Sequence, residues 1–156
     1  MKKSIFLILL VLLLMTGCDV NTAKGNYKEG TYFGTKEYES YGKKYVVTAT
    51  IYVDNNGLIK SCFLDSTYIK DDINTTKKTL GDAYGMKETS AGIGKIPGGA
   101  EWYEQAKVIE DKVVAEQNLD WVKYDETGTK LDGVSGVTIS ANDYIEAIGN
   151  ALNQAK

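Results

Sequence analysis

The first half of the chain alternates apolar and polar positions in the way that is typical of half-buried β-strands. Residues 31–35 and 45–53 are rich in Thr, Val, Ile and aromatic residues, which favour extended structure. Residues 54–57 are Asp-Asn-Asn-Gly, and Asn-Gly is a strong signal for a hairpin turn. Residues 58–64 supply the return strand, so the pattern predicts an antiparallel sheet whose hairpin is determined locally.

In the second half of the chain, the spacing of apolar residues changes to that of amphipathic helices. Trp102, Ala106, Ile109 and Val113 recur every three or four residues among charged residues, which predicts a helix over residues 101–117. A second stripe predicts a helix at the C-terminus, and its members are Tyr144, Ile145, Ile148, Ala151 and Leu152. Strands followed by helices indicate an α+β domain, a twisted antiparallel sheet with helices packed against it.

The stretch between these halves carries weaker signals. Residues 74–84 are expected to form a short helix that ends at Gly85. Residues 90–99 form a glycine-rich loop that contains the only proline and lacks the Gly-Lys-[Ser/Thr] ending of a nucleotide-binding P-loop. This loop is either a flexible connection or a segment that closes over a bound ring. Residues 119–124 are expected to be extended, and residues 125–128 to form a turn.

The N-terminus has the pattern of a secretory signal. A positively charged start, Met-Lys-Lys, precedes an unbroken apolar run over residues 5–15, 11 residues that are too few to span a bilayer as a stable helix. The run ends in Met15-Thr16-Gly17-Cys18, which resembles a bacterial lipobox with Met15 in place of the commoner Leu. Small residues directly before a cysteine are what lipoprotein processing requires, so lipidation of Cys18 is expected.

By this resemblance the chain has three parts. Residues 1–17 are a lipoprotein signal peptide, residues 18–27 are a lipidated tether, and residues 28–156 form the folded domain. Acyl chains such as palmitate on Cys18 would hold the protein at the extracytoplasmic face of the cell membrane. The alternatives are an ordinary signal peptide and an uncleaved anchor.

Composition narrows the chemistry open to this domain. The chain has no His and two Cys, which argues against haem, iron–sulfur and structural zinc sites and against a Ser-His-Asp triad. Cys62 would be the only thiol of the mature chain, and its place in a predicted strand suggests a small buried apolar residue. Loss of Lys2 and Lys3 with the signal peptide changes the formal net charge from −3 to −5. An acidic domain without a basic run does not favour nucleic-acid binding.

The stretch from Asp132 to Thr138, Asp-Gly-Val-Ser-Gly-Val-Thr, sets hydroxyl groups beside a glycine turn just before the predicted last helix. Ser140 is expected to be the N-cap of that helix, with Asp143 completing a capping arrangement. The first turn of a helix has unpaired N–H groups and the positive end of the dipole, so a phosphate is favoured there. Gly136 permits a tight turn. The simpler alternative is a glycine turn whose Ser and Thr residues serve only as caps.

This stretch resembles the D-x-x-[ST]-G-A-[ST] signature of the FMN-binding domain family. Asp132, Ser135, Gly136 and Thr138 match the signature, and Val137 stands where the family usually has Ala. The resemblance extends to the Tyr- and Gly-rich N-terminal strands, to the segment from Thr76 to Met86, and to the start of the helix at residues 101–106. In these features the chain is similar to flavin-carrying lipoproteins of extracellular electron transfer.

The resemblance implies that Thr138 carries FMN through a covalent phosphoester bond made by a separate flavin transferase. The protein would then be an electron carrier and not an enzyme. It would take electrons from a quinol- or NADH-linked membrane donor and pass them to an extracellular acceptor. Trp102 and Tyr103 are candidates to stack on the flavin ring, with core packing as the alternative for Trp102. The other function left open is a non-redox surface lipoprotein of the same fold that binds a small ligand or a partner protein, with the motif reduced to a turn by Val137.

Overall fold

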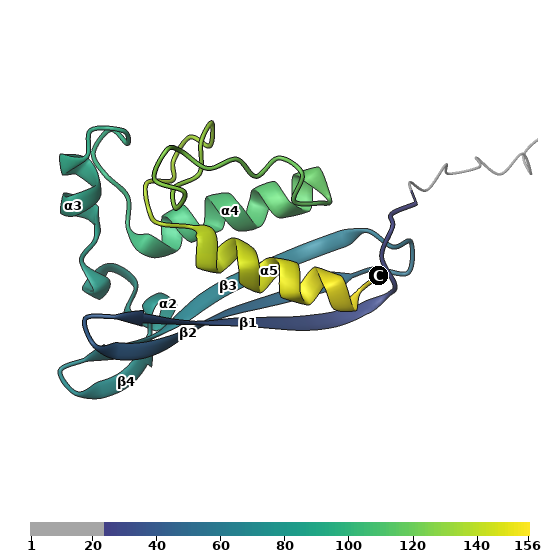
Figure 1. Ribbon diagram of the computed structural model, residues 1–156, viewed down its shortest axis with the longest axis horizontal. Helices are drawn as coiled ribbons and strands as arrows, with labels where there is room; N and C mark the ends of the chain where they lie inside the picture. The colour runs from purple at the N-terminus through teal and green to yellow at the C-terminus, as the bar shows by residue number, and fades with distance from the viewer. Residues whose placement is uncertain (1–23) are drawn as a thin grey trace, which may run out of the picture.

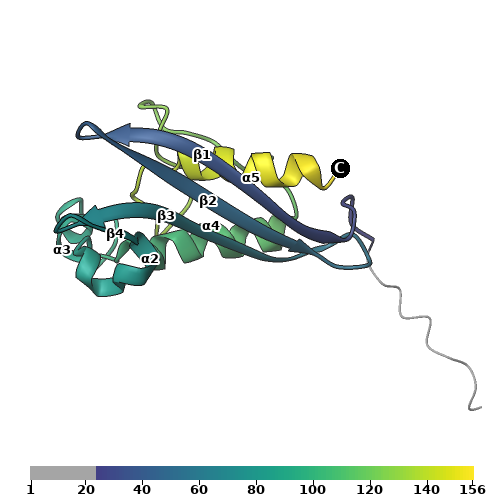
Figure 2. The same ribbon diagram turned by 90° about the horizontal axis from the view of Figure 1, so that it is seen from below.

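A four-stranded antiparallel sheet in the order β1-β2-β3-β4 forms one layer of the domain. The computed structural model describes residues 24–156, so the predicted signal peptide and Cys18 lie outside the described residues. The strands are β1 Gly30–Ser40, β2 Lys43–Val53, β3 Ile59–Lys70 and the short β4 Ile73–Thr76. Figure 2 shows the three long strands twisting in front of the helices, which confirms the predicted α+β architecture.

The hairpin between β2 and β3 forms at the predicted place. One carboxylate oxygen of Asp54 accepts hydrogen bonds of 2.9 Å from the backbone N–H groups of Asn56 and Leu58, which closes the turn with local contacts. The strands run further than residues 31–35 and 58–64. The first hairpin pairs Tyr38 with Tyr45, and their rings stack with centroids 5.4 Å apart. Aromatic cross-strand pairs stabilise a sheet, and this pair extends β1 beyond its predicted end.

Two helices cover one face of the sheet (Figure 1): α4, Trp102–Glu116, packs against β3, and α5, Asn142–Gln154, packs against β1 and β2. The predicted helix over residues 101–117 agrees with α4, since Glu101 is its N-cap and Gln117 its C-cap. Glu101 and Glu104 make a reciprocal capping box, in which each carboxylate accepts from a backbone N–H at the helix start. Within residues 24–156, no helix combines the length and the apolar character needed to cross a bilayer.

The predicted cap of the last helix is wrong. The helix begins at Asn142 with Ala141 in the N-cap position, and no side chain caps it. Ser140 instead forms an antiparallel bridge with Lys130, and the Ala141 N–H donates to the Thr129 carbonyl at 2.7 Å. These backbone hydrogen bonds to a distant segment keep the residues before Asn142 outside the helix.

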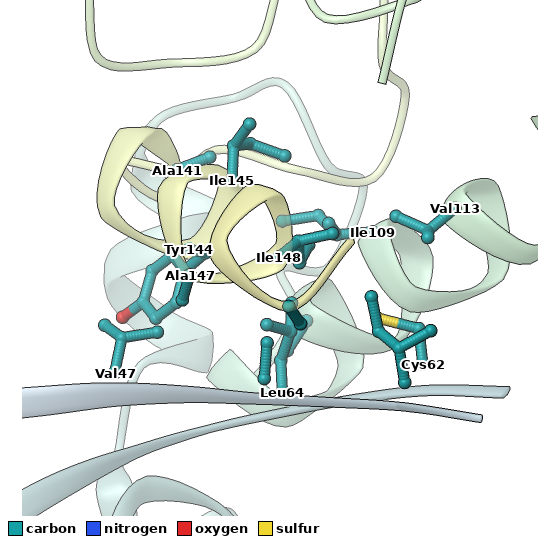
Figure 3. Close-up of a cluster of buried hydrophobic side chains, with 14 of the residues drawn as sticks. Val47, Cys62, Leu64, Ile109, Val113, Ala141, Tyr144, Ile145, Ala147 and Ile148 are labelled. Carbon is teal, nitrogen blue, oxygen red and sulfur yellow. The ribbon is translucent and has the colours of Figure 1, made fainter. Parts of the chain in front are cut away.

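The core lies between the sheet and the two helices (Figure 3). All members of both predicted apolar stripes are buried, so both stripes are confirmed. Gly34 of β1 allows the closest approach, because a Cβ atom there would lie 2.1 Å from the Ala147 carbonyl oxygen of α5. The side chains drawn in Figure 3 include Val47, Cys62 and Leu64 from the sheet, Ile109 and Val113 from α4, and Tyr144, Ile145 and Ile148 from α5.

The middle of the chain differs from its prediction. Residues 73–76 add strand β4, and the expected helix is a short α2, Lys77–Leu80, followed by a 3-10 turn, Gly81–Tyr84. Gly85 ends this segment with φ +79°, as expected. Helix α3, Lys87–Gly92, occupies the start of the predicted glycine-rich loop. The Glu101 carboxylate accepts from the N–H groups of Met86 and Lys87 at 2.8 and 3.1 Å, so a distant residue determines where α3 begins.

The segment after α4 was also predicted only in part. Residues 119–124 do not form the expected strand, because the Val122 N–H turns back to the Leu119 carbonyl and only Tyr124 joins a bridge, to Leu131. The predicted turn over residues 125–128 is confirmed by a 2.9 Å bond from the Gly128 N–H to the Asp125 carbonyl.

Candidate functional site

The motif lies in a loop that is closed at its base by one backbone bridge, between Lys130 and Ser140. A second bridge, between Tyr124 and Leu131, closes the turn that precedes the loop. Gly136 has φ +85°, a left-handed conformation that glycine adopts without strain, which agrees with the predicted turn. The loop lies over α4, since a Cβ atom at Gly136 would touch a methyl group of Val108 at 3.4 Å.

Thr138 is buried and bonded to Gln105 of α4. The amide oxygen of Gln105 accepts from the Thr138 N–H at 2.7 Å, from the Thr138 hydroxyl at 3.1 Å and from the Ile139 N–H at 3.2 Å. The Gln105 amide nitrogen donates to the Ala100 carbonyl at 3.1 Å, which fixes the orientation of the amide. Two backbone N–H groups thus converge on one oxygen atom, an arrangement that suits any oxygen-bearing group.

Helix α3 covers the Thr138 hydroxyl. The Ser90 hydroxyl lies 3.5 Å from the Thr138 hydroxyl and also accepts from the Gln105 amide nitrogen at 3.4 Å. Ser90, Gln105 and Thr138 are 1%, 0% and 6% exposed, so the Thr138 hydroxyl is shielded from solvent in this structure.

A cleft of about 340 Å³ lies beside the motif loop. Residues 131–137 of the motif loop line it together with Lys95 and Ile96 of the glycine-rich loop. Lys95 and Ile96 of the glycine-rich loop therefore face the motif loop. This position is the one required of a segment that closes over a bound ring, the second interpretation of residues 90–99.

A second cavity of about 280 Å³, the Lys77 cavity, is lined by Ile139 and Ser140, which directly follow Thr138. Its lining also includes the aromatic residues Tyr38, Trp102 and Tyr144, the acidic residues Glu39 and Asp143, and Met86. Val137 lines the first cleft and Ile139 lines the second, so the two sequence neighbours of Thr138 face different cavities.

Lys77 supplies the positive charge of this cavity. Its ammonium group donates to the Tyr144 hydroxyl at 2.9 Å, and the Trp102 indole N–H donates to the same hydroxyl at 3.1 Å. Burial lowers the pKa of Lys77 to about 8, although Asp65 and Asp143 oppose this shift. Burial also raises the pKa of Tyr84, one of the rings around the ammonium, to about 12.

The structure brings most of the predicted site residues together, with two exceptions. Asp132, Ser135, Gly136, Val137 and Thr138 share the motif loop, and Ser140 lines the Lys77 cavity beside Trp102. Trp102 is 1% exposed and packs in the core, which agrees with the alternative interpretation of that residue. Tyr103 instead bonds to Asp82 and lines a separate cleft with Lys78 and Lys107. Cys18 lies outside the described residues.

Sequence reasoning missed Gln105, Ser90 and Lys77. Gln105 had a signal, because it is a polar residue at a helix position that faces inward with Trp102 and Ile109. Ser90 and Lys77 had none, since their neighbours in the fold lie 48 and 67 residues away in the sequence. Cys62, by contrast, is buried as expected, and burial raises its pKa to about 12, which makes it a poor nucleophile.

No protein-family model, curated protein or solved structure matches this chain.

Proposed function

We propose that this protein is an electron-transfer flavoprotein that carries FMN covalently on the Thr138 hydroxyl. A separate flavin transferase makes the phosphoester bond, and the protein catalyses no reaction on a substrate itself. The lipidated Cys18 holds the domain at the extracytoplasmic face of the cell membrane. A quinol- or NADH-linked membrane donor and an extracellular acceptor are its redox partners.

The observation that carries this proposal is that the two sequence neighbours of Thr138 line two different cavities, each with a lysine in its lining. Val137 and Lys95 line the cleft beside the motif loop, and Ile139 and Lys77 line the Lys77 cavity. A phosphate on Thr138 would have a lysine in the lining of each neighbouring cavity, and a flat ring would find aromatic walls in the second cavity. The donor set thus suits a group that carries both a phosphate and a ring.

The Thr138 and Ile139 N–H groups add a second element of fit. Both donate to the Gln105 amide oxygen, at 2.7 and 3.2 Å, so they already form a small oxygen-binding site. Attachment of FMN would require Gln105 to release these two N–H groups, which would then be free to hold a phosphate oxygen. Bound FMN supplies the reversible uptake of electrons, while the chain supplies position and electrostatics.

Val137 is compatible with this role. Its side chain is 6% exposed and belongs to the core cluster, so the methyl groups that distinguish it from Ala are accommodated by packing. The non-redox alternative is favoured by the hydrogen bond that already satisfies the Thr138 hydroxyl. One experiment separates the two functions.

The test is co-expression of the full chain with an active flavin transferase. After denaturation, we expect in-gel flavin fluorescence and one FMN on the peptide that contains Thr138, measured by mass spectrometry. Thr138→Ala abolishes the signal, and Thr127→Ala, a matched threonine on the exposed turn, preserves it. An unmodified Thr138 peptide beside an active transferase refutes the proposal and leaves the non-redox alternative.

Membrane attachment needs its own test. Cys18→Ser is expected to move the protein from the membrane fraction to the soluble extracytoplasmic fraction, because the acyl chains are lost. Retention of this variant in the membrane, with no acyl group on the wild-type N-terminal peptide, would show that the lipid anchor is absent.

A further inference from the structure

Lys77 is a buried cation with fewer partners than it has donors. Its residue is 8% exposed, and the only hydrogen bond of its ammonium within residues 24–156 is to the Tyr144 hydroxyl. No carboxylate of the same residues lies within ion-pair distance of it. An ammonium group has three N–H donors, so two of them lack a protein acceptor.

Aromatic rings surround this ammonium from four elements. Its nitrogen lies 5.3 Å from the ring centroids of Tyr84 and Trp102, and 5.6 and 5.7 Å from those of Tyr144 and Tyr38. Attraction to ring faces offsets part of the cost of removing the charge from water. The ring faces supply no hydrogen-bond acceptor, so the two remaining N–H groups of the Lys77 ammonium stay available to a ligand.

The cage is held in place before any ligand arrives. The Tyr144 hydroxyl accepts from both Lys77 and Trp102, and the Tyr38 hydroxyl is bonded to Ser66 at 3.1 Å. Ser66 and Tyr144 are 0% and 5% exposed, so these bonds are shielded from water. A buried, incompletely paired cation in a fixed aromatic cavity is typical of a binding site and is costly in a purely structural role.

The volume and the lining of the cavity favour a flat group. At about 280 Å³ it lies just below the range of roughly 300–1,000 Å³ that holds a whole drug-sized ligand. It therefore suits part of a larger cofactor, and Ile139 of its lining directly follows Thr138. Ring faces favour a planar ligand, and the ammonium favours one whose edge carries electron-rich oxygen or nitrogen atoms.

We propose that the Lys77 cavity seats the ring system of the flavin on Thr138, with the Lys77 ammonium donating to an electron-rich edge of the ring. This inference rests on the proposed function. When the ring accepts two electrons and one proton from the membrane donor, the reduced ring carries one negative charge. When the ring is reoxidised, the two electrons and the proton pass on to the acceptor. Lys77 stabilises that charge and is a positioning and potential-setting residue, with no bond made or broken at its nitrogen.

The first test uses the full chain expressed without flavin transferase and titrated with lumiflavin, which has the ring but no ribityl phosphate. Quenching of flavin fluorescence is expected to saturate, and Lys77→Met weakens binding at least tenfold. Lys107→Met is the control, because Lys107 lines the separate cleft beside Tyr103, and it leaves lumiflavin binding unchanged. Absence of saturable binding, or a loss with Lys107→Met and not with Lys77→Met, overturns the proposal even where FMN is attached to Thr138.

The second test measures the midpoint potential of the flavin-loaded chain. Lys77→Met is expected to reduce the preference for the reduced ring about tenfold, a fall of about 30 mV for two electrons. Lys77→Gln keeps N–H donors without the charge, so it retains lumiflavin binding and still lowers the potential. This variant also serves if Lys77→Met fails to fold, and an unchanged potential in a folded Lys77→Gln chain contradicts the charge role. If FMN is never attached while Lys77-dependent lumiflavin binding persists, the proposed function fails and the ring site stands.

Discussion

The burial of Lys77 predicts a stability that rises with pH in the weakly alkaline range. The pKa of Lys77 falls from 10.5 to about 8 on folding because burial disfavours the charged form. Between these values the unfolded chain binds more protons than the folded chain, so the free energy of unfolding increases as the pH rises. Below pH 8 the full cost of burying the charge is present, and above 10.5 it is gone.

The size of this effect follows from the same two values. Between pH 7 and pH 9 the Lys77 contribution to the free energy of unfolding grows by ~1.3 kcal/mol. Other buried groups act in the opposite direction, since burial raises the pKa of Cys62 to about 12 and that of Tyr84 to about 12. A comparison of Lys77→Met with the wild type cancels these shared contributions and isolates the lysine.

The assay is urea denaturation of the full chain and of Lys77→Met at several pH values from 7 to 9. The difference between the two free energies of unfolding is expected to shift by ~1.3 kcal/mol in favour of the wild type as the pH rises. Cys62→Ala is the matched control, and its difference from the wild type shifts in favour of the variant, because the wild-type thiol must stay protonated in the fold. A pH-independent difference for Lys77→Met would show that Lys77 is not buried as a cation, and the reasoning would fail.

Three further substitutions test the packing. Ile148→Ala removes a side chain that is 0% exposed and is expected to lower the free energy of unfolding by about 2–5 kcal/mol in urea. A loss below about 1 kcal/mol would place Ile148 outside the core. Gly34→Ala brings a Cβ atom to 2.1 Å from the Ala147 carbonyl oxygen, so thermal denaturation should show a loss of about 1–3 kcal/mol or more. Glu110→Ala leaves the Leu64 N–H and the Lys78 ammonium without their shared carboxylate, and a loss of about 3–5 kcal/mol is expected in calorimetry. A loss below about 1 kcal/mol for Glu110→Ala would show that the shared carboxylate does not stabilise the fold.

Much of the fold was predictable because local contacts specify it. The β2–β3 hairpin depends on Asp54 and the residues up to Leu58, and α4 depends on its apolar spacing and on the Glu101–Glu104 capping box. The motif loop was recognised for the same reason, since Gly136 and its neighbours form a continuous stretch.

What the sequence alone determined was therefore the set of interactions between residues a few positions apart: the hairpin, the two amphipathic helices and the glycine turn. Only the tertiary structure decided where α3 and α5 begin. The Glu101 carboxylate accepts from the N–H at the start of α3, and the bridge between Lys130 and Ser140 keeps Ser140 outside α5. The tertiary structure also decided the surroundings of Thr138, whose partner Gln105 lies 33 residues away, and of Lys77, whose partner Tyr144 lies 67 residues away. Such contacts form only when the helices close over the sheet, because their free energy comes from burial shared by distant segments.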